Sequence, residues 1–221
     1  MLKKIFLSIM FCCVALSASA VSLDILEREP SYVMSILKLS EKIVDNLGIT
    51  DPAVKQNVLY ILANRYFKLN DIYEVRDQKV KYAKAVLTGA SKQAAIEAAE
   101  LEKDATLYRC HFEFPASLSL YINDKQIDAI KDGMTYNSLQ VQYESLVDMV
   151  PSLTEEEKKQ IYAWYKEARE FSMDAENSDK KHAAFNKYKG RINNYLTKRG
   201  YDLGKERNEW YKRLKAAGKK I

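Results

Sequence analysis

Residues 53–88 contain neither glycine nor proline, and this uninterrupted segment constrains the fold more than any other. It follows Thr50-Asp51-Pro52, in which an N-cap residue precedes a proline suited to the first turn of a helix. The segment predicts either one helix of roughly nine turns or two helices that break near Asn70-Asp71. Either form requires a domain built around long helices.

The rest of the chain repeats this helical pattern, with only 7 glycines and 4 prolines in 221 residues. Gly48 and Gly89 are expected to end helices, Ser91 to cap the next one, and Pro115 to end or kink it. Two capping boxes are expected to open later helices, at Asn123–Gln126 and Thr154–Glu157. Further helices are expected at about 31–47, 91–114, 124–133, 136–149, 155–175, 180–199 and 203–217.

No segment shows a sustained alternation of apolar and polar residues, which argues against strands. No linker rich in Pro, Gly or Ser divides the chain. The sequence therefore predicts an all-α fold: a single compact multi-helix domain of about seven or eight helices over residues 21–221. A basic C-terminal helical pair is expected at 180–217.

Residues 1–20 are typical of a cleaved signal peptide. Lys3 and Lys4 precede an apolar run over 5–16, and Ala18-Ser19-Ala20 supplies small residues for cleavage. The apolar run is too short to span a bilayer. We therefore expect a mature protein that begins at Val21, is periplasmic or secreted, and has no membrane anchor.

Charge is distributed unevenly along the expected mature chain. Residues 180–221 carry 14 basic and 3 acidic side chains, a net charge of +11, whereas residues 21–179 carry a net charge of −8. Two explanations remain open: the basic segment binds an anionic partner, or it folds against the acidic body. Export makes nucleic acid an unsuitable partner.

Several classes of enzyme lack their signatures in this sequence. His111 and His182 are the two histidines, and neither belongs to a His-Glu-x-x-His frame, so no metal site and no cofactor is expected. No nucleophile elbow, phosphate-binding loop or dinucleotide fingerprint occurs. Cys110 is expected to be a small buried apolar residue, and Glu167, Glu170 and Asp174 to form a solvated helix face.

The segment from Lys181 to Tyr201 is the strongest candidate for a binding site. It alternates basic, aromatic and amide side chains, and Gly190 stands within the expected helix although glycine costs ~1 kcal/mol there. Such a glycine predicts that another backbone or a ligand comes close. The candidate ligand-binding residues include a polar stripe at helical spacing and neighbouring aromatic and basic residues: His182, Asn186, Lys189 and Asn193, then Tyr188, Arg191, Tyr195 and Tyr201.

Four segments carry a resemblance to a known family: 131–136, 150–156, 181–196 and 200–203. With them the chain resembles a family of secreted proteins of unknown function from Bacteroidetes. The resemblance implies an all-helical fold and an association with polysaccharide-degrading systems, with pectin-type acidic glycans as one context. It implies no catalytic residue. A second, partial similarity is to small periplasmic stress chaperones, although Glu157 stands where their helix-start motif has glutamine.

These observations predict an exported protein that binds, or assists the processing of, acidic oligosaccharide or polysaccharide. Aromatic faces stack on sugar rings, and cations pair with uronate carboxylates. One alternative is a small uronide lyase or glycoside hydrolase with Tyr188, His182 or Arg191 near the scissile bond; its catalytic residues stay unknown. Another alternative is a periplasmic chaperone-like helical protein with an exposed apolar concave face.

Overall fold

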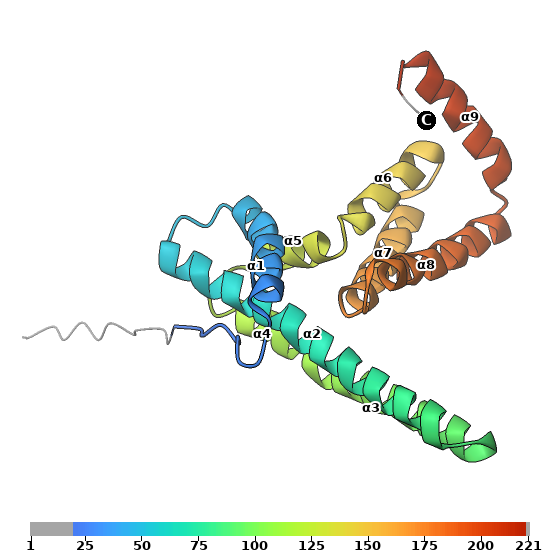
Figure 1. Ribbon diagram of the computed structural model, residues 1–221. Coiled ribbons are helices and arrows are strands. Elements are labelled where there is room, and N and C mark those ends of the chain that lie inside the picture. Colours follow the sequence, from blue (N-terminus) through green and yellow to red (C-terminus); the bar gives the residue numbers. More distant parts are fainter. Residues whose placement is uncertain (1–19, 220–221) are drawn as a thin grey trace, which may run out of the picture.

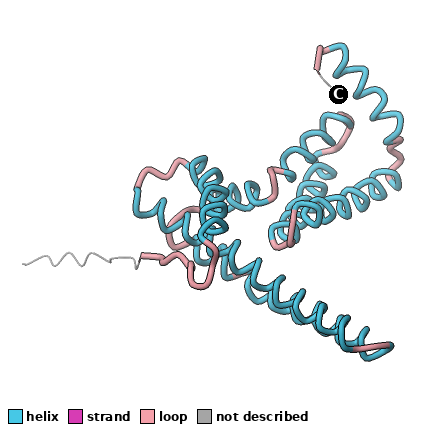
Figure 2. Tube along the Cα trace, viewed as in Figure 1, coloured by secondary structure: helices cyan, strands magenta, loops and turns pink. Residues whose placement is uncertain are grey.

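The all-α prediction is confirmed. A computed structural model of the chain describes residues 20–219, which form nine α-helices, one short 3-10 helix and no strand (Figure 2). The predicted signal peptide, residues 1–20, lies outside the described residues apart from Ala20. The helices are α1 (Pro30–Val44), α2 (Pro52–Val86), α3 (Gly89–His111), α4 (Glu113–Leu118), α5 (Asp124–Met134), α6 (Ser138–Met149), α7 (Glu155–Met173), α8 (Ser178–Lys198) and α9 (Leu203–Ala216), with η1 (Asp45–Leu47) after α1.

The uninterrupted segment forms one helix, the first of the two predicted alternatives. Asp51 Oδ1 accepts hydrogen bonds from the backbone N–H groups of Ala53 at 2.8 Å and Val54 at 3.2 Å, which caps the start of α2. The helix continues through Asn70-Asp71 for 35 residues. Figure 1 shows α2 and α3 as an antiparallel pair whose far end projects from the rest of the molecule.

Two predicted boundaries in this pair were wrong. Gly89 begins α3, with φ of +55°, and Thr88 rather than Ser91 is its N-cap. Ser91 Oγ instead donates a hydrogen bond to the Thr88 carbonyl at 2.7 Å. Because only two residues separate the helices, the cap must lie within that turn. The segment containing Pro115 forms the additional short helix α4, since proline is tolerated in a first turn.

Both predicted capping boxes are present. Thr154 Oγ1 accepts a hydrogen bond from the Glu157 backbone N–H at 3.2 Å, and Glu157 Oε2 accepts one from the Thr154 N–H at 2.9 Å. Asn123 and Gln126 exchange the same pair of bonds at the start of α5. These caps satisfy backbone donors that a helix start leaves unpaired.

The domain contains two main apolar cores. The first lies among α1, α2, α4 and α5, and it includes Met173 from the end of α7. The second lies among α6, α7 and α8. Its fully buried members include Ile161, Ala168, Phe185, Ile192 and Leu196. The helix α7 therefore joins the two cores, and its side chains face both halves of the molecule.

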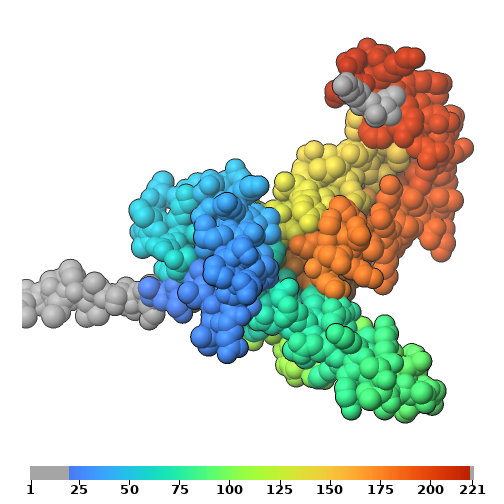
Figure 3. All heavy atoms as spheres, viewed as in Figure 1, coloured from blue at the N-terminus to red at the C-terminus, as the bar shows by residue number. Residues whose placement is uncertain are grey.

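The helical spacing of Ile161, Tyr165, Ala168 and Phe171 would place all four on one apolar face of α7, and one of them departs from it. Ile161, Tyr165 and Ala168 are buried as expected, but the Phe171 side chain is 64% exposed. At the far end of the molecule α9 extends away from the body (Figure 3). Among residues 20–219 no helix is both long and apolar enough to cross a membrane.

Candidate functional site

Helix α8 carries most of the predicted site and is held against α7 by its apolar stripe. Asn177 caps its start, because its Oδ1 accepts a hydrogen bond from the Lys180 N–H at 3.0 Å. Phe185, Ile192 and Leu196 are buried in the second core. Their spacing leaves one flank of α8 beside α7 and turns the opposite flank to solvent.

The predicted polar stripe lies on the solvent side of α8. His182, Asn186 and Lys189 are exposed and Asn193 is half-buried. The His182 ring stacks on Tyr136, with ring centroids 5.6 Å apart. The structure therefore does not gather these four residues around a common cavity with the aromatic residues of α8.

The other flank of α8 forms an open groove with α7, of about 1030 Å³. We call it the α7–α8 groove. Three of the predicted residues line it: Tyr188, Arg191 and Tyr195. The rest of its lining consists of Trp164, Glu167 and Phe171 from α7, and Ala184, Lys187, Gly190, Asn194 and Lys198 from α8.

Aromatic side chains in this groove hold each other in place. The Trp164 and Tyr195 rings meet edge to face, with centroids 5.0 Å apart. Phe171 stacks on Tyr188 at 6.3 Å. The Arg191 guanidinium lies over the Trp164 ring, 4.7 Å from its centroid. Because these rings are already held in position beside a cation, a ligand that stacks on them would cause little further loss of side-chain conformational entropy.

The cations of the groove are only weakly engaged. Arg191 lies 3.4 Å from Glu167, and both side chains are about half exposed, so water screens this pair. No carboxylate in the described part of the chain lies within ion-pair distance of Lys187 or Lys198. Burial, with a hydrogen bond to Glu167, raises the pKa of Tyr188 to about 12.

Gly190 faces the open groove. A Cβ atom built on it would meet no described heavy atom within 4 Å. Of the two alternatives predicted for this glycine, the close approach of another backbone is therefore not found in the described chain. The space beside it remains open, as the alternative of an approaching ligand requires.

Tyr201 lies outside the groove, where its hydroxyl binds the carboxylate of Glu157. Its hydroxyl donates to Glu157 Oε2 at 2.7 Å, and Arg199 Nε lies 2.6 Å from Glu157 Oε1. Burial opposes the charged form of Glu157, but hydrogen bonds from Thr154, Tyr201 and Arg199 outweigh it and lower the Glu157 pKa to about 2. In this position Tyr201 fastens the end of α8 to the start of α7.

A second pocket, which sequence reasoning missed, lies where the end of α7 meets α2 and α3. We call it the histidine pocket; its volume is about 600 Å³. His111 Nδ1 lies 2.7 Å from Asp174 Oδ2, and His111 Nε2 lies 3.6 Å from Glu170 Oε2. The other lining residues are Tyr73, Asp104, Leu107, Tyr108, Phe112, Phe171 and Ala175.

The carboxylates of this pocket are partly buried and paired, so the predicted solvated face was wrong for Glu170 and Asp174. Arg65, whose side chain is 3% exposed, binds the second oxygen of Asp174. Lys131 Nζ lies 2.8 Å from Glu170. No sequence signal pointed to this cluster, because Arg65 and Asp174 are 109 positions apart. Among residues 20–219 no group of His, Cys, Asp and Glu side chains is arranged to hold a metal ion.

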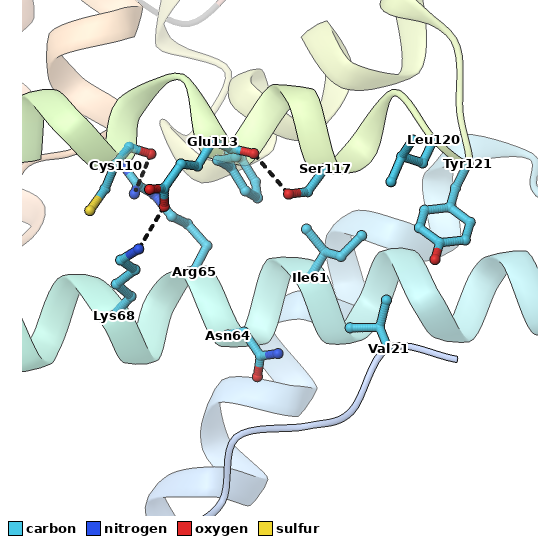
Figure 4. A pocket seen from close by; sticks show the side chains of 11 residues that line it. Val21, Ile61, Asn64, Arg65, Lys68, Cys110, Glu113, Ser117, Leu120 and Tyr121 are labelled. Carbon is cyan, nitrogen blue, oxygen red and sulfur yellow. Dashed lines mark hydrogen bonds and ion pairs between the residues drawn. The ribbon is translucent and has the colours of Figure 1, made fainter. Parts of the chain in front are cut away.

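A third, smaller pocket of about 320 Å³ lies between α2 and α4 (Figure 4). Lys68 and Glu113 face each other across it, at 2.6 Å. Arg65 donates to the Cys110 carbonyl at 3.2 Å, and Cys110 is buried as predicted. Because the charged side chains of this pocket pair with each other, it offers fewer unpaired cations to a ligand than the α7–α8 groove does.

The comparison with protein families matches residues 33–216 to the model of a family described as a protein of unknown function, DUF3826. The chain belongs to this family. The comparison with curated proteins gives no match. The matched range extends from α1 to the end of α9 and includes the lining of both the α7–α8 groove and the histidine pocket. The prediction of an uncharacterised family is thus confirmed at this coarser level.

Proposed function

We propose that this DUF3826 protein binds acidic oligosaccharide or polysaccharide in the α7–α8 groove. The observation that carries the proposal is the presence of Lys187 and Lys198, without carboxylate partners in the described chain, beside the fixed rings of Trp164 and Tyr195. Sugar C–H faces pack on aromatic rings, and uronate carboxylates pair with lysine and arginine.

The distribution of ion pairs supports an external anion. Within residues 20–219, the basic C-terminal pair makes two ion pairs to other helices, Arg191–Glu167 and Arg199–Glu157. Arg213 donates instead to backbone carbonyls of Asp148 and Met149. Folding of the basic segment against the acidic body therefore neutralises few of its cations, and exposed lysines such as Lys187 and Lys198 stay available to an anionic ligand.

The place of action belongs to the same proposal. A protein that binds pectin-type glycans needs access to them, and the predicted signal peptide would deliver it to the periplasm or the exterior. The resemblance to accessories of polysaccharide-degrading systems agrees with this setting.

Calorimetric titration with oligogalacturonides and with neutral glucan oligosaccharides tests the proposal. We expect binding of the acidic oligomers only, with affinity that falls as salt is added. The double variant Lys187→Ala/Lys198→Ala should weaken binding roughly fivefold to tenfold. The matched control Lys189→Ala removes one lysine from the solvent side of the same helix and should change affinity by less than about twofold.

Two results would contradict the proposal. The first is an absence of binding to every acidic oligomer at low salt. The second is a loss in Lys189→Ala as large as in the double variant, which would move the ligand to the polar stripe.

The histidine pocket favours an enzyme as the second candidate function. An aspartate at Nδ1 orients an imidazole and leaves Nε2 to exchange a proton with a substrate. This pair differs from the residues expected for a lyase or hydrolase, because Tyr188 is buried and His182 stacks on Tyr136 away from the groove. Incubation with uronide polymers, followed at the ultraviolet absorbance of unsaturated products and by new reducing ends, tests for turnover; no change in either signal excludes both activities on those polymers.

A further inference from the structure

We propose that the histidine pocket is a second sugar subsite, continuous with the α7–α8 groove, and that it takes an uncharged, hydroxyl-rich ring. The ligand would then be an acidic heteroglycan in which neutral sugars adjoin uronates, rather than a polymer of uronates alone. This inference rests on the proposed function and specifies the class of glycan.

Phe171 connects the two cavities. Its ring lines both, is 64% exposed, and stacks on Tyr188 at the end of the groove. A glycan that lies along the groove and passes over this ring enters the histidine pocket. No rearrangement of the backbone is needed for that path, since both cavities are open in the same structure.

The rim of the histidine pocket consists of exposed aromatic side chains. Tyr108 is 71% exposed and Phe112 is 60% exposed, and their rings meet edge to face at 5.7 Å. Phe112 also contacts the His111 ring, with centroids 5.0 Å apart. With Phe171, these exposed rings form an apolar surface around one cavity, of the kind that marks a binding site. Flat rings of this kind favour a sugar ring.

The interior of the pocket determines which sugar fits. Asp174 and Glu170 present carboxylate oxygens, which accept hydrogen bonds from hydroxyls. The cations that neutralise them, Arg65, Lys131 and Arg169, are largely buried and do not line the cavity. Apart from His111, no basic side chain of the described chain lines it. A uronate placed here would find no lysine or arginine in the lining to pair with, whereas a neutral ring would meet hydrogen-bond acceptors.

The size of the cavity agrees with this occupant. Its volume of about 600 Å³ lies within the ~300–1,000 Å³ range of small-ligand sites. The groove offers lysines and an arginine, and the histidine pocket offers acceptors. Two adjacent subsites, one that prefers a uronate and one that prefers a neutral sugar, favour a glycan in which charged and neutral sugars alternate.

The test compares two oligosaccharides of equal length by calorimetry. One contains galacturonate only, and the other alternates galacturonate with a neutral hexose. The full chain is expected to bind the alternating oligomer about tenfold more tightly. The double variant Tyr108→Ala/Phe112→Ala should lose most of this preference while its affinity for the galacturonate oligomer stays within about twofold of the original.

Leu101→Ala provides a matched control, because Leu101 lies on the same helix α3 with a 69% exposed side chain and lines neither cavity. It should leave both affinities unchanged, and far-UV circular dichroism verifies that each variant is folded. Tighter binding of the galacturonate oligomer by the full chain, or a preference that survives in the double variant, would overturn the subsite while leaving the proposed function intact. Absence of binding to both oligomers would instead refute the proposed function.

Discussion

Glu167 and Asp174 lie two turns apart on α7, yet their carboxylates meet different surroundings. Glu167 is about half exposed and lies 3.4 Å from an equally exposed Arg191. Asp174 is 14% exposed and is held by Arg65 and His111. The difference arises because α8 packs along α7, whereas the side chains of Arg65 from α2 and His111 from α3 reach the carboxylate of Asp174 at the C-terminal end of α7.

The comparison shows that residue type alone does not define a site on this helix. Where α7 lines the α7–α8 groove, the ion pair of Glu167 is exposed and weak, so a ligand can replace it with little loss of free energy. In the histidine pocket, Glu170 and Asp174 are paired with buried cations, and their carboxylate oxygens lie beside exposed aromatic rings. Two cavities with opposite preferences can therefore lie side by side on one helix.

The largest expected effect is on the free energy of unfolding, which should fall much more when Asp174 is replaced than when Glu167 is replaced. Asp174→Ala leaves the buried Arg65 guanidinium without its carboxylate, and we expect the free energy of unfolding to fall by about 3 kcal/mol. Glu167→Ala removes an exposed partner and should cost less than about 1 kcal/mol. Urea denaturation of both variants measures the difference. Equal losses would contradict the buried pairing of Arg65 with Asp174.

A smaller effect concerns a third carboxylate of α7, Glu157. Its pKa is lowered to about 2 in the folded state, below the value of 4.5 for a free glutamate. Its contribution to stability is therefore fully present above pH about 4.5 and is lost as the pH falls toward 2. Glu157→Gln should lose about 2 kcal/mol at neutral pH and flatten this acid dependence, because charged hydrogen bonds to Tyr201 and Arg199 disappear.

Chemical denaturation across this pH range provides the measurement. Glu167→Gln is the control, since it changes a carboxylate of the same helix that has one exposed partner, and it should keep the neutral-pH stability of the unmodified protein. An unchanged acid dependence in Glu157→Gln would contradict the described network.

The smallest effect tests whether the groove is open for a ligand. Gly190→Ala should stabilise α8 by about 0.5–1 kcal/mol, because alanine favours a helix and its methyl group meets no described atom. The same methyl group lies in the groove, so affinity for acidic oligosaccharide should fall although the fold becomes more stable. Thermal unfolding and calorimetry measure the two changes.

Gly133→Ala is the matched control for that substitution. Its added Cβ would lie 2.9 Å from Ile43 Cγ2, so this variant should lose stability. A gain in stability at Gly190 without any loss of affinity would remove the functional reason for that glycine.

Much of the fold could be predicted because its signals are local. The capping boxes at Asn123 and Thr154 and the stop at Gly48 each involve residues within a few positions of one another. The buried stripe of α8 follows from helical spacing. The cap of α3 was misplaced because Thr88 and Ser91 are equally suitable residue types, and the choice depends on how tightly α3 turns back along α2.

The candidate site could be predicted only in part. The sequence pointed to α8, and Tyr188, Arg191 and Tyr195 do line the groove, but the helical pattern could not say which flank of α8 would face α7. The polar stripe was therefore expected in the site and lies in solvent instead. The histidine pocket had no signal, because His111 and Asp174 are 63 positions apart and meet through the packing of three helices.

The amino-acid sequence by itself determined that this chain forms helices, where most of them begin and end, and that its C-terminal pair is strongly basic. These properties depend on hydrogen bonds and side-chain spacing within a few residues. Only the tertiary structure decided which lysines remain without carboxylate partners, that Phe171 is exposed between two cavities, and that Arg65, His111 and Asp174 form one cluster. Burial and long-range pairing depend on how the helices pack, and no local pattern encodes that arrangement.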